Sequence, residues 1–174
     1  MKHFASLCIK ILCFIIVSIY INSYLISLPV PIRMTNVNPV MEQIKTDLVK
    51  LKVPNNKIQK IAEATYAAHK STGINPKLIL ALIKTESNFK EDALGPPNRT
   101  KIRYKGLLQT PTASWYTDVD ILHGTRILED KLKQSQNNLP LALALYKGGD
   151  NKVARKQANQ VIQLYHQLLK PDKS

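Results

Sequence analysis

Glu86 is the residue of this sequence best placed for acid–base chemistry. It lies near the end of an almost entirely apolar stretch, 74–89, and Ile79, Leu82 and Ile83 precede it at helical spacing. In a helix these four side chains share one face. A carboxyl group on an apolar face has a raised pKa and can hold a proton near neutral pH, because low dielectric disfavours its charged form. The alternative is that Glu86 simply ends the helix in solvent.

Further short motifs follow the Glu86-Ser87 pair in a fixed order. They are Gly106-Leu-Leu-Gln109, Thr110-Pro-Thr-Ala113 and Ala144-Leu-Tyr-Lys-Gly-Gly149. In this order and at this spacing they resemble the lytic transglycosylase domain related to goose-type lysozyme. The resemblance runs from about residue 57 to about residue 169. Any one motif is weak, whereas several in order are fairly specific.

The sequence departs from the pattern of that family at three places. Leu108 stands where Met is usual, which is a substitution of similar volume. Lys147 replaces the Asn that follows the tyrosine, and Gly95-Pro96-Pro97 stands where a Ser-Pro pair is often found. None of these changes replaces the acid itself.

The resemblance implies a reaction that uses a single carboxylate. Glycosidic bonds are usually cleaved by two, but lytic transglycosylases use one glutamate, which is Glu86 in this chain. It protonates the oxygen between N-acetylmuramic acid and N-acetylglucosamine, and its conjugate base then takes the proton of the C6 hydroxyl. That hydroxyl attacks C1 of the same sugar and gives a 1,6-anhydro product. The remaining candidates for a second carboxylate occupy positions that a helix cap or a polar loop explains: Glu91, Asp92, Asp118 and Asp120.

The resemblance also assigns residues to substrate binding. Tyr146 orients the acid or the sugar, although a buried ring with a satisfied hydroxyl is the simpler alternative. Gln109 forms hydrogen bonds to an N-acetyl group, and Gly106 allows the backbone to approach the sugar closely. Ser87 and Leu108 complete this set, as neighbours within the same motifs.

Three cations alternate with apolar residues between Glu86 and Gly106. Lys101, Arg103 and Lys105 lie at a period of two, which places them on one face of an extended segment. In the family a small hairpin or loop at this place borders the substrate cleft. We expect the three cations to hold an anionic substrate beside the cleft. A solvated basic edge without a ligand is the alternative.

The first thirty residues indicate export. Lys2 and Lys10 precede an uncharged run, 11–30, rich in Ile, Leu, Val, Phe and Tyr. About 20 apolar residues can span a bilayer, and no small-x-small cleavage site is convincing. An uncleaved anchor with a cytoplasmic N-terminus is therefore favoured, since the lysines precede the span. The segment is only moderately hydrophobic, so a cleaved signal peptide stays open.

Charge and composition limit the classes of binding partner that this protein can have. The chain has 25 Lys and Arg against 12 Asp and Glu, a formal charge of +13. This excess favours an anionic partner such as nucleic acid, a membrane surface or the cell wall. The leader argues against a helical nucleic-acid-binding domain, because it directs the chain out of the compartment that holds chromosomal DNA and RNA.

Both cysteines, Cys8 and Cys13, lie in the leader, and His69, His123 and His166 lack partners at ligand spacing, so we expect no disulfide, metal or other cofactor.

Helices must position these residues. Amphipathic patterns predict a helix from about residue 40 that stops before Pro54, and another from about residue 57. Asn75 is a good N-cap and Pro76 a good first residue for the Glu86 helix. A short helical turn with Trp115 and helices from about residue 120, from Pro140 and over 154–168 complete the pattern.

The sequence therefore predicts an all-α fold, with at most a small hairpin. We expect a signal peptide or membrane anchor over 1–30, a linker over 31–39, a lysozyme-like catalytic domain over 40–170 and a tail over 171–174.

The predicted function is an exported peptidoglycan lytic transglycosylase of the periplasm or cell envelope, anchored in the inner membrane or secreted. The alternative is a weakly active wall-remodelling or assembly module of a secretion or conjugation apparatus or of a phage particle. Glu86 favours the enzyme, since a pure binding protein has no use for a buried acid.

Overall fold

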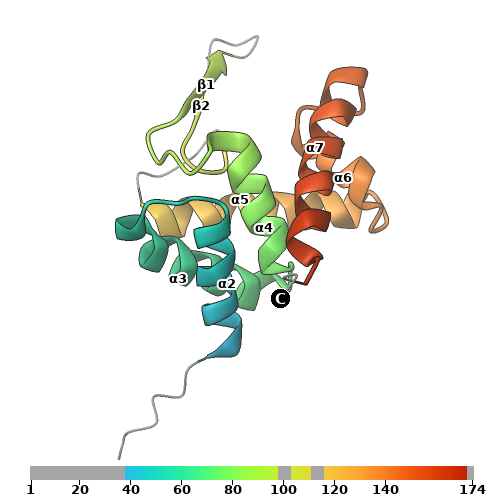
Figure 1. The fold of residues 1–174 in the computed structure, drawn as a ribbon. Coiled ribbons are helices and arrows are strands. Elements are labelled where there is room, and N and C mark those ends of the chain that lie inside the picture. Colours follow the sequence, from blue (N-terminus) through green and yellow to red (C-terminus); the bar gives the residue numbers. More distant parts are fainter. Residues whose placement is uncertain (1–37, 98–102, 111–115, 172–174) are drawn as a thin grey trace, which may run out of the picture. The chain divides into compact units, whose positions relative to one another are not determined.

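A computed structural model describes residues 38–97, 103–110 and 116–171 (Figure 1). This part holds six helices and one two-stranded hairpin, which confirms the predicted all-α fold with a small hairpin. In chain order the elements are α2 (Pro39–Lys50), α3 (Asn55–Thr72), α4 (Pro76–Ser87), β1 (Leu94–Pro97), β2 (Arg103–Lys105), α5 (Thr117–Gln134), α6 (Leu139–Tyr146) and α7 (Lys152–Leu169). The leader, most of the predicted linker, Lys101 and Trp115 lie outside the described residues.

Asparagine side chains cap four of these helices. Asn38, Asn75, Asn138 and Asn151 accept hydrogen bonds from backbone N–H groups in the first turns of α2, α4, α6 and α7. Three of these helices also have proline at one of the first two positions, where its missing N–H group costs nothing. The predicted start of α4 at Asn75 and Pro76 is confirmed.

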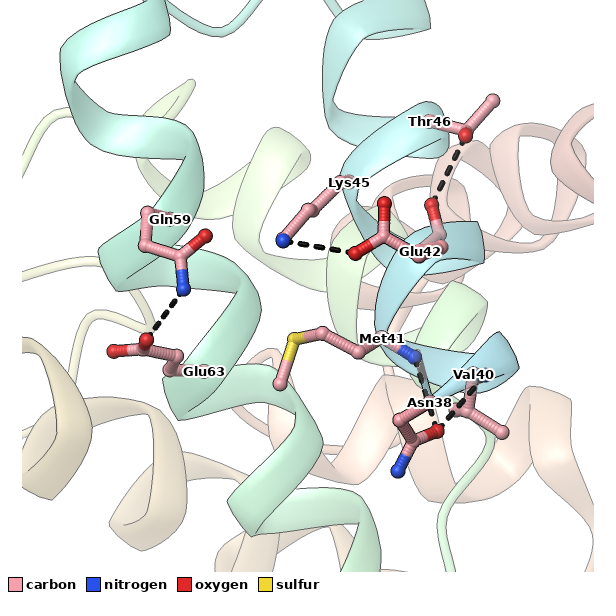
Figure 2. A network of polar contacts seen from close by, with 8 residues as sticks. All are labelled: Asn38, Val40, Met41, Glu42, Lys45, Thr46, Gln59 and Glu63. Atoms are coloured by element: carbon pink, nitrogen blue, oxygen red, sulfur yellow. Dashed lines mark hydrogen bonds and ion pairs between the residues drawn. The ribbon is translucent and has the colours of Figure 1, made fainter. Parts of the chain in front are cut away.

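The first two helices pack against each other, and Figure 2 shows the polar contacts along them. Asn38 caps α2 through Val40 and Met41, and one turn later Lys45 forms an ion pair of 2.9 Å with Glu42. On α3, Gln59 donates a hydrogen bond to Glu63 one turn further along. These contacts lie within one helix each. Between the helices, Asn38 donates a hydrogen bond of 2.6 Å to the Tyr66 hydroxyl of α3, and buried apolar residues such as Ile44, Leu48 and Ile61 pack together.

The core is built around α4, whose residues from Leu78 to Ile83 are all buried. A helix that is apolar on every side must be enclosed by other elements, and α2, α3 and α7 all contact this one. In Figure 1 the C-terminal end of α4 lies between the hairpin and the N-terminal half of α7. The core thus fixes the position of Glu86, which lies one residue before the end of α4.

The hairpin is followed by a tight turn that returns the chain to the domain. β1 and β2 pair antiparallel, with Leu94 opposite Lys105. Residues 106 to 109 then form a turn closed by a bridge between Lys105 and Thr110. In the described part no helix is long and apolar enough to cross a membrane.

Candidate active site

A cleft of about 860 Å³ lies at the C-terminal ends of α4 and α6. The hairpin, the turn after it, α5 and α7 also contribute side chains to its lining. Three of the residues predicted from sequence line this cleft together, although they are far apart in the chain: Glu86, Gln109 and Tyr146. The cleft also includes residues to which the sequence analysis gave no role in the site, among them Tyr104, Lys131 and Lys147.

Glu86 lies at the edge between the core and the cleft. Ile79, Leu82 and Ile83, on its face of α4, are fully buried, while the Glu86 side chain is 14% exposed. Burial raises the pKa of Glu86 above its ordinary value, and the nearby ammonium group of Lys147 partly opposes that rise. The carboxyl group therefore has the environment that a general acid requires, and it is reachable from the cleft.

Lys147 forms an ion pair with Glu86. Its Nζ atom lies 2.9 Å from Glu86 Oε1, and it also donates a longer hydrogen bond of 3.5 Å to Thr85 Oγ1. The Lys147 side chain is only 7% exposed. At this position, where the resemblance described above would predict Asn, the chain instead has a cation directly against the candidate acid.

Tyr146 connects α6 to the turn after the hairpin. Its hydroxyl group donates a hydrogen bond of 2.8 Å to the backbone carbonyl of Leu108. Burial, together with the negative charges of Glu86 and Asp120, keeps the pKa of Tyr146 well above its ordinary value. The hydroxyl is therefore a neutral donor, and it holds the turn that carries Gln109.

Gln109 is fixed by two hydrogen bonds from its amide nitrogen. Nε2 donates to the carbonyls of Gly106 and Ala93, at 2.8 and 3.0 Å. With both amide hydrogens used, the group that Gln109 can offer to a ligand is its carbonyl oxygen, an acceptor. The residue lines the cleft but is oriented by the hairpin rather than being free to turn.

Asp120 of α5 also supports the turn formed by residues 106 to 109. Its side chain is buried on α5, and Oδ2 accepts a hydrogen bond from the backbone N–H of Leu107. Gly106 has a φ of +84°, and a Cβ atom there would lie 2.4 Å from Asp120 Oδ2. Burial raises the pKa of Asp120, although the turn's backbone donors oppose this. The glycine is thus required both by its conformation and by the carboxylate beneath it.

Three residues of the predicted set, Ser87, Gly106 and Leu108, are buried beside the cleft rather than in its lining. The Ser87 hydroxyl donates a hydrogen bond to the carbonyl of Ile83 within α4. Leu108 is fully buried, and its side chain packs against Gly124 of α5 so closely that a Cβ atom there would clash. In the described structure both side chains have packing roles.

The strand β2 presents its aromatic residue to the cleft. Tyr104 lines the cleft, while Arg103 and Lys105, its neighbours in sequence, do not. Because side chains of a strand alternate between its two faces, the two cations lie on the face opposite to Tyr104. Lys101, the third cation of the predicted basic face, lies outside the described residues.

Three of the described non-glycine residues with positive φ lie beside the site, and three others, Lys52, Gln136 and Asn137, lie in loops elsewhere. Asn88 and Phe89, which follow the Glu86-Ser87 pair, have φ values of +52° and +62°, and Gln109 has a φ of +49°. Such conformations are unfavourable for residues other than glycine and persist only where surrounding contacts enforce them. At Asn88, the C-cap of α4, this conformation ends the helix two residues after Glu86.

The sequence analysis named Lys147 and Asp120 but gave neither a role in this site, and it did not single out Tyr104. The i+1 position of Lys147 after Tyr146 was a possible signal, since the two residues lie at the end of one helix. Among the described residues, no three His, Cys, Asp or Glu side chains are grouped as metal ligands would be.

In comparisons with known proteins, no family model and no curated protein sequence matches this chain.

Proposed function

We propose that this protein is an exported peptidoglycan lytic transglycosylase that cleaves the bond between N-acetylmuramic acid and N-acetylglucosamine. The observation that carries the proposal is the half-buried Glu86 carboxyl group, which meets Tyr146 and Gln109 in one cleft. Its raised pKa suits a group that must donate a proton. The family resemblance of the motifs supports the assignment independently of this geometry.

In the proposed reaction Glu86 protonates the bridging oxygen and then accepts the proton of the C6 hydroxyl. That hydroxyl attacks C1, so the new bond is intramolecular and the product ends in 1,6-anhydro-N-acetylmuramic acid. Gln109 offers its carbonyl oxygen to the amide N–H of an N-acetyl group. Tyr146 holds the turn that carries Gln109 in place, through its bond to Leu108.

The proposed location is the periplasm or cell envelope, with residues 1–30 as a membrane anchor or a cleaved signal. The partner is then the glycan strand of the wall, which suits the positive charge of the chain. A second candidate function is a weakly active wall-remodelling or assembly module. The ion pair between Glu86 and Lys147 favours it, because an ammonium group beside the carboxyl group favours its ionised form, which cannot donate a proton.

Zymography on sacculi tests the proposal. Full-length protein should clear the wall, and Glu86→Gln should lose about 10²-fold or more of the activity, because the amide cannot donate a proton to the glycosidic oxygen. Glu63→Gln is the matched control, since Glu63 is exposed on α3 and outside the cleft. Full turnover in Glu86→Gln would refute the assignment of the acid.

The products distinguish this reaction from hydrolysis. Mass spectrometry of digested sacculi should find 1,6-anhydro termini. Termini heavier by one water would identify a lysozyme instead.

A further inference from the structure

Lys147 contacts Glu86 at a place where two helices end. Glu86 lies in the last turn of α4, and Lys147 caps the C-terminus of α6. The Nζ atom of Lys147 lies 2.9 Å from Glu86 Oε1 and 3.5 Å from Thr85 Oγ1. The carbonyl groups at a helix C-terminus carry partial negative charge, so both helix ends disfavour a carboxylate and favour a cation.

The low exposure of both side chains makes this contact stronger than a surface ion pair. The attraction within an exposed pair is weakened by the surrounding water and contributes little, whereas Lys147 and Glu86 are 7% and 14% exposed. A buried charge that loses its partner is strongly disfavoured. The protonation state of the Glu86 carboxyl group therefore depends on whether a cation is present at position 147.

Other titratable groups near the cleft do not duplicate this contact. Those that line its described part are Tyr146 of α6, Tyr104 of β2 and Lys131 of α5, while α7 contributes the uncharged Gln157 and Gln160.

More distant groups do not duplicate it either. Lys84, on the helix of Glu86, donates to the carbonyl of Leu51 instead, and Asp120 lies near the hydroxyl of Tyr146 as a second negative group. Among the described residues, Lys147 is the cation within ion-pair distance of Glu86.

We propose that Lys147 is a positioning residue for Glu86, which orients its carboxyl group and favours the ionised form. The pH range in which Glu86 can donate a proton then lies lower than it would with a neutral side chain at position 147. This inference rests on the proposed function, because the pH range matters to a proton donor. Relative to a neutral side chain at position 147, Lys147 thereby lowers the fraction of protonated Glu86 at a given pH, and cleavage should increase as the surroundings become more acidic.

The sign of the effect follows from the charges. Removing an ammonium group beside a carboxylate disfavours the ionised form, so the pKa of Glu86 rises. Glu86 must be protonated to act, so kcat/KM should fall about tenfold per pH unit above its titration midpoint. Lys147→Met should therefore move this alkaline limb to higher pH, whereas Lys147→Arg retains the charge and should leave it near that of the parent.

Two measurements on the full-length chain test the proposal. The first is a carbon-13 NMR titration of the Glu86 carboxyl group, assigned with Glu86→Gln, in the parent, Lys147→Met and Lys147→Gln. The second is the pH profile of glycan cleavage by the same proteins. Lys133→Met is the matched control, because Lys133 forms an ion pair with Glu129 on the exposed face of α5. It should move neither the titration nor the profile.

The outcomes separate this inference from the proposed function. An upward shift of the Glu86 titration in both neutral variants, with the alkaline limb moving alike, supports the inference. An unchanged titration in a folded neutral variant overturns it, whatever the activity. If the parent cleaves no glycan at any pH, the proposed function fails, while the NMR titration still decides whether Lys147 controls the ionisation of Glu86. Having two neutral variants, of different shape, keeps the test available if one does not fold.

Discussion

The hydroxyl group of Tyr146 donates a hydrogen bond of 2.8 Å to the backbone carbonyl of Leu108, 38 residues earlier in the chain. This bond joins the C-terminal end of α6 to the turn after the hairpin. The same turn is also held by Asp120 of α5, which accepts a hydrogen bond from the backbone N–H of Leu107. Two polar contacts thus fix the backbone that presents Gln109 to the cleft, and each can be tested separately.

We expect Tyr146→Phe to lower both stability and activity. The change leaves the buried carbonyl of Leu108 without its donor, which costs about 1–3 kcal/mol in the free energy of unfolding. Activity should fall because the turn with Gln109 is less well held. Urea denaturation and zymography measure the two effects.

Tyr66→Phe is the control for this variant. The Tyr66 hydroxyl accepts a hydrogen bond of 2.6 Å from Asn38, on the α2 and α3 side of the domain. We expect this variant to lose stability while retaining activity. An equal loss of activity in the two variants would show that Tyr146 acts only through global stability.

A comparison of two glycines isolates the close approach of Asp120 to the turn. Gly73 and Gly106 both have positive φ values, of +72° and +84°, but a Cβ atom at Gly73 would meet open space. Gly73→Ala should cost about 1 kcal/mol for its backbone conformation. Gly106→Ala should cost about 1–3 kcal/mol more, because its methyl group overlaps the carboxylate of Asp120. Equal losses, measured by thermal unfolding, would mean that the turn moves aside freely.

The buried carboxyl group of Asp120 should make stability depend on pH. Its pKa is raised in the folded protein, mainly by burial, so the native state retains a proton that the unfolded chain has already released. The free energy of unfolding then decreases as pH rises from the unfolded pKa through the folded one. Asp120→Asn keeps an acceptor for Leu107 and should remove this decrease.

Asp120→Ala separates the charge from the hydrogen bond. Its free energy of unfolding should be lower than that of Asp120→Asn by about 1–3 kcal/mol at every pH, because the N–H of Leu107 loses its acceptor. Urea denaturation from pH 3 to pH 8 distinguishes the variants. A curve for Asp120→Asn parallel to that of the parent would assign the pH dependence to another group.

Local signals in the sequence were sufficient to predict α4 and the face that carries Glu86. Asn75 and Pro76 mark its start, and its apolar residues are buried as the periodicity indicates. Sequence could not show that Lys147 meets Glu86, because this contact forms only where the ends of α4 and α6 converge. The position of Asp120 under Gly106 is likewise a tertiary contact, so the sequence shows only a glycine and a carboxylate 14 residues apart.

The alternation in β2 illustrates a further limit. A period of two predicts that Arg103 and Lys105 share a face, but it does not say which face meets the cleft. That depends on how the hairpin packs against the turn that follows it. In the structure the cleft receives Tyr104, whose ring could not be distinguished from a core residue by spacing alone.

The two faces of β2 should therefore contribute differently to substrate binding. Tyr104 is partly exposed in the cleft, and an aromatic ring there can pack against the apolar face of a sugar. Tyr104→Ala should raise KM for soluble glycan fragments at both low and high salt, since this contact is not ionic.

The double change Arg103→Ala and Lys105→Ala should weaken binding to anionic sacculi by no more than about 1 kcal/mol per residue. Its effect should disappear at high salt, because screening removes attraction between exposed charges. Binding and turnover measured at two salt concentrations decide between these roles. A salt-dependent loss in Tyr104→Ala, or a salt-independent loss in the double variant, would reverse the assignment of the two faces.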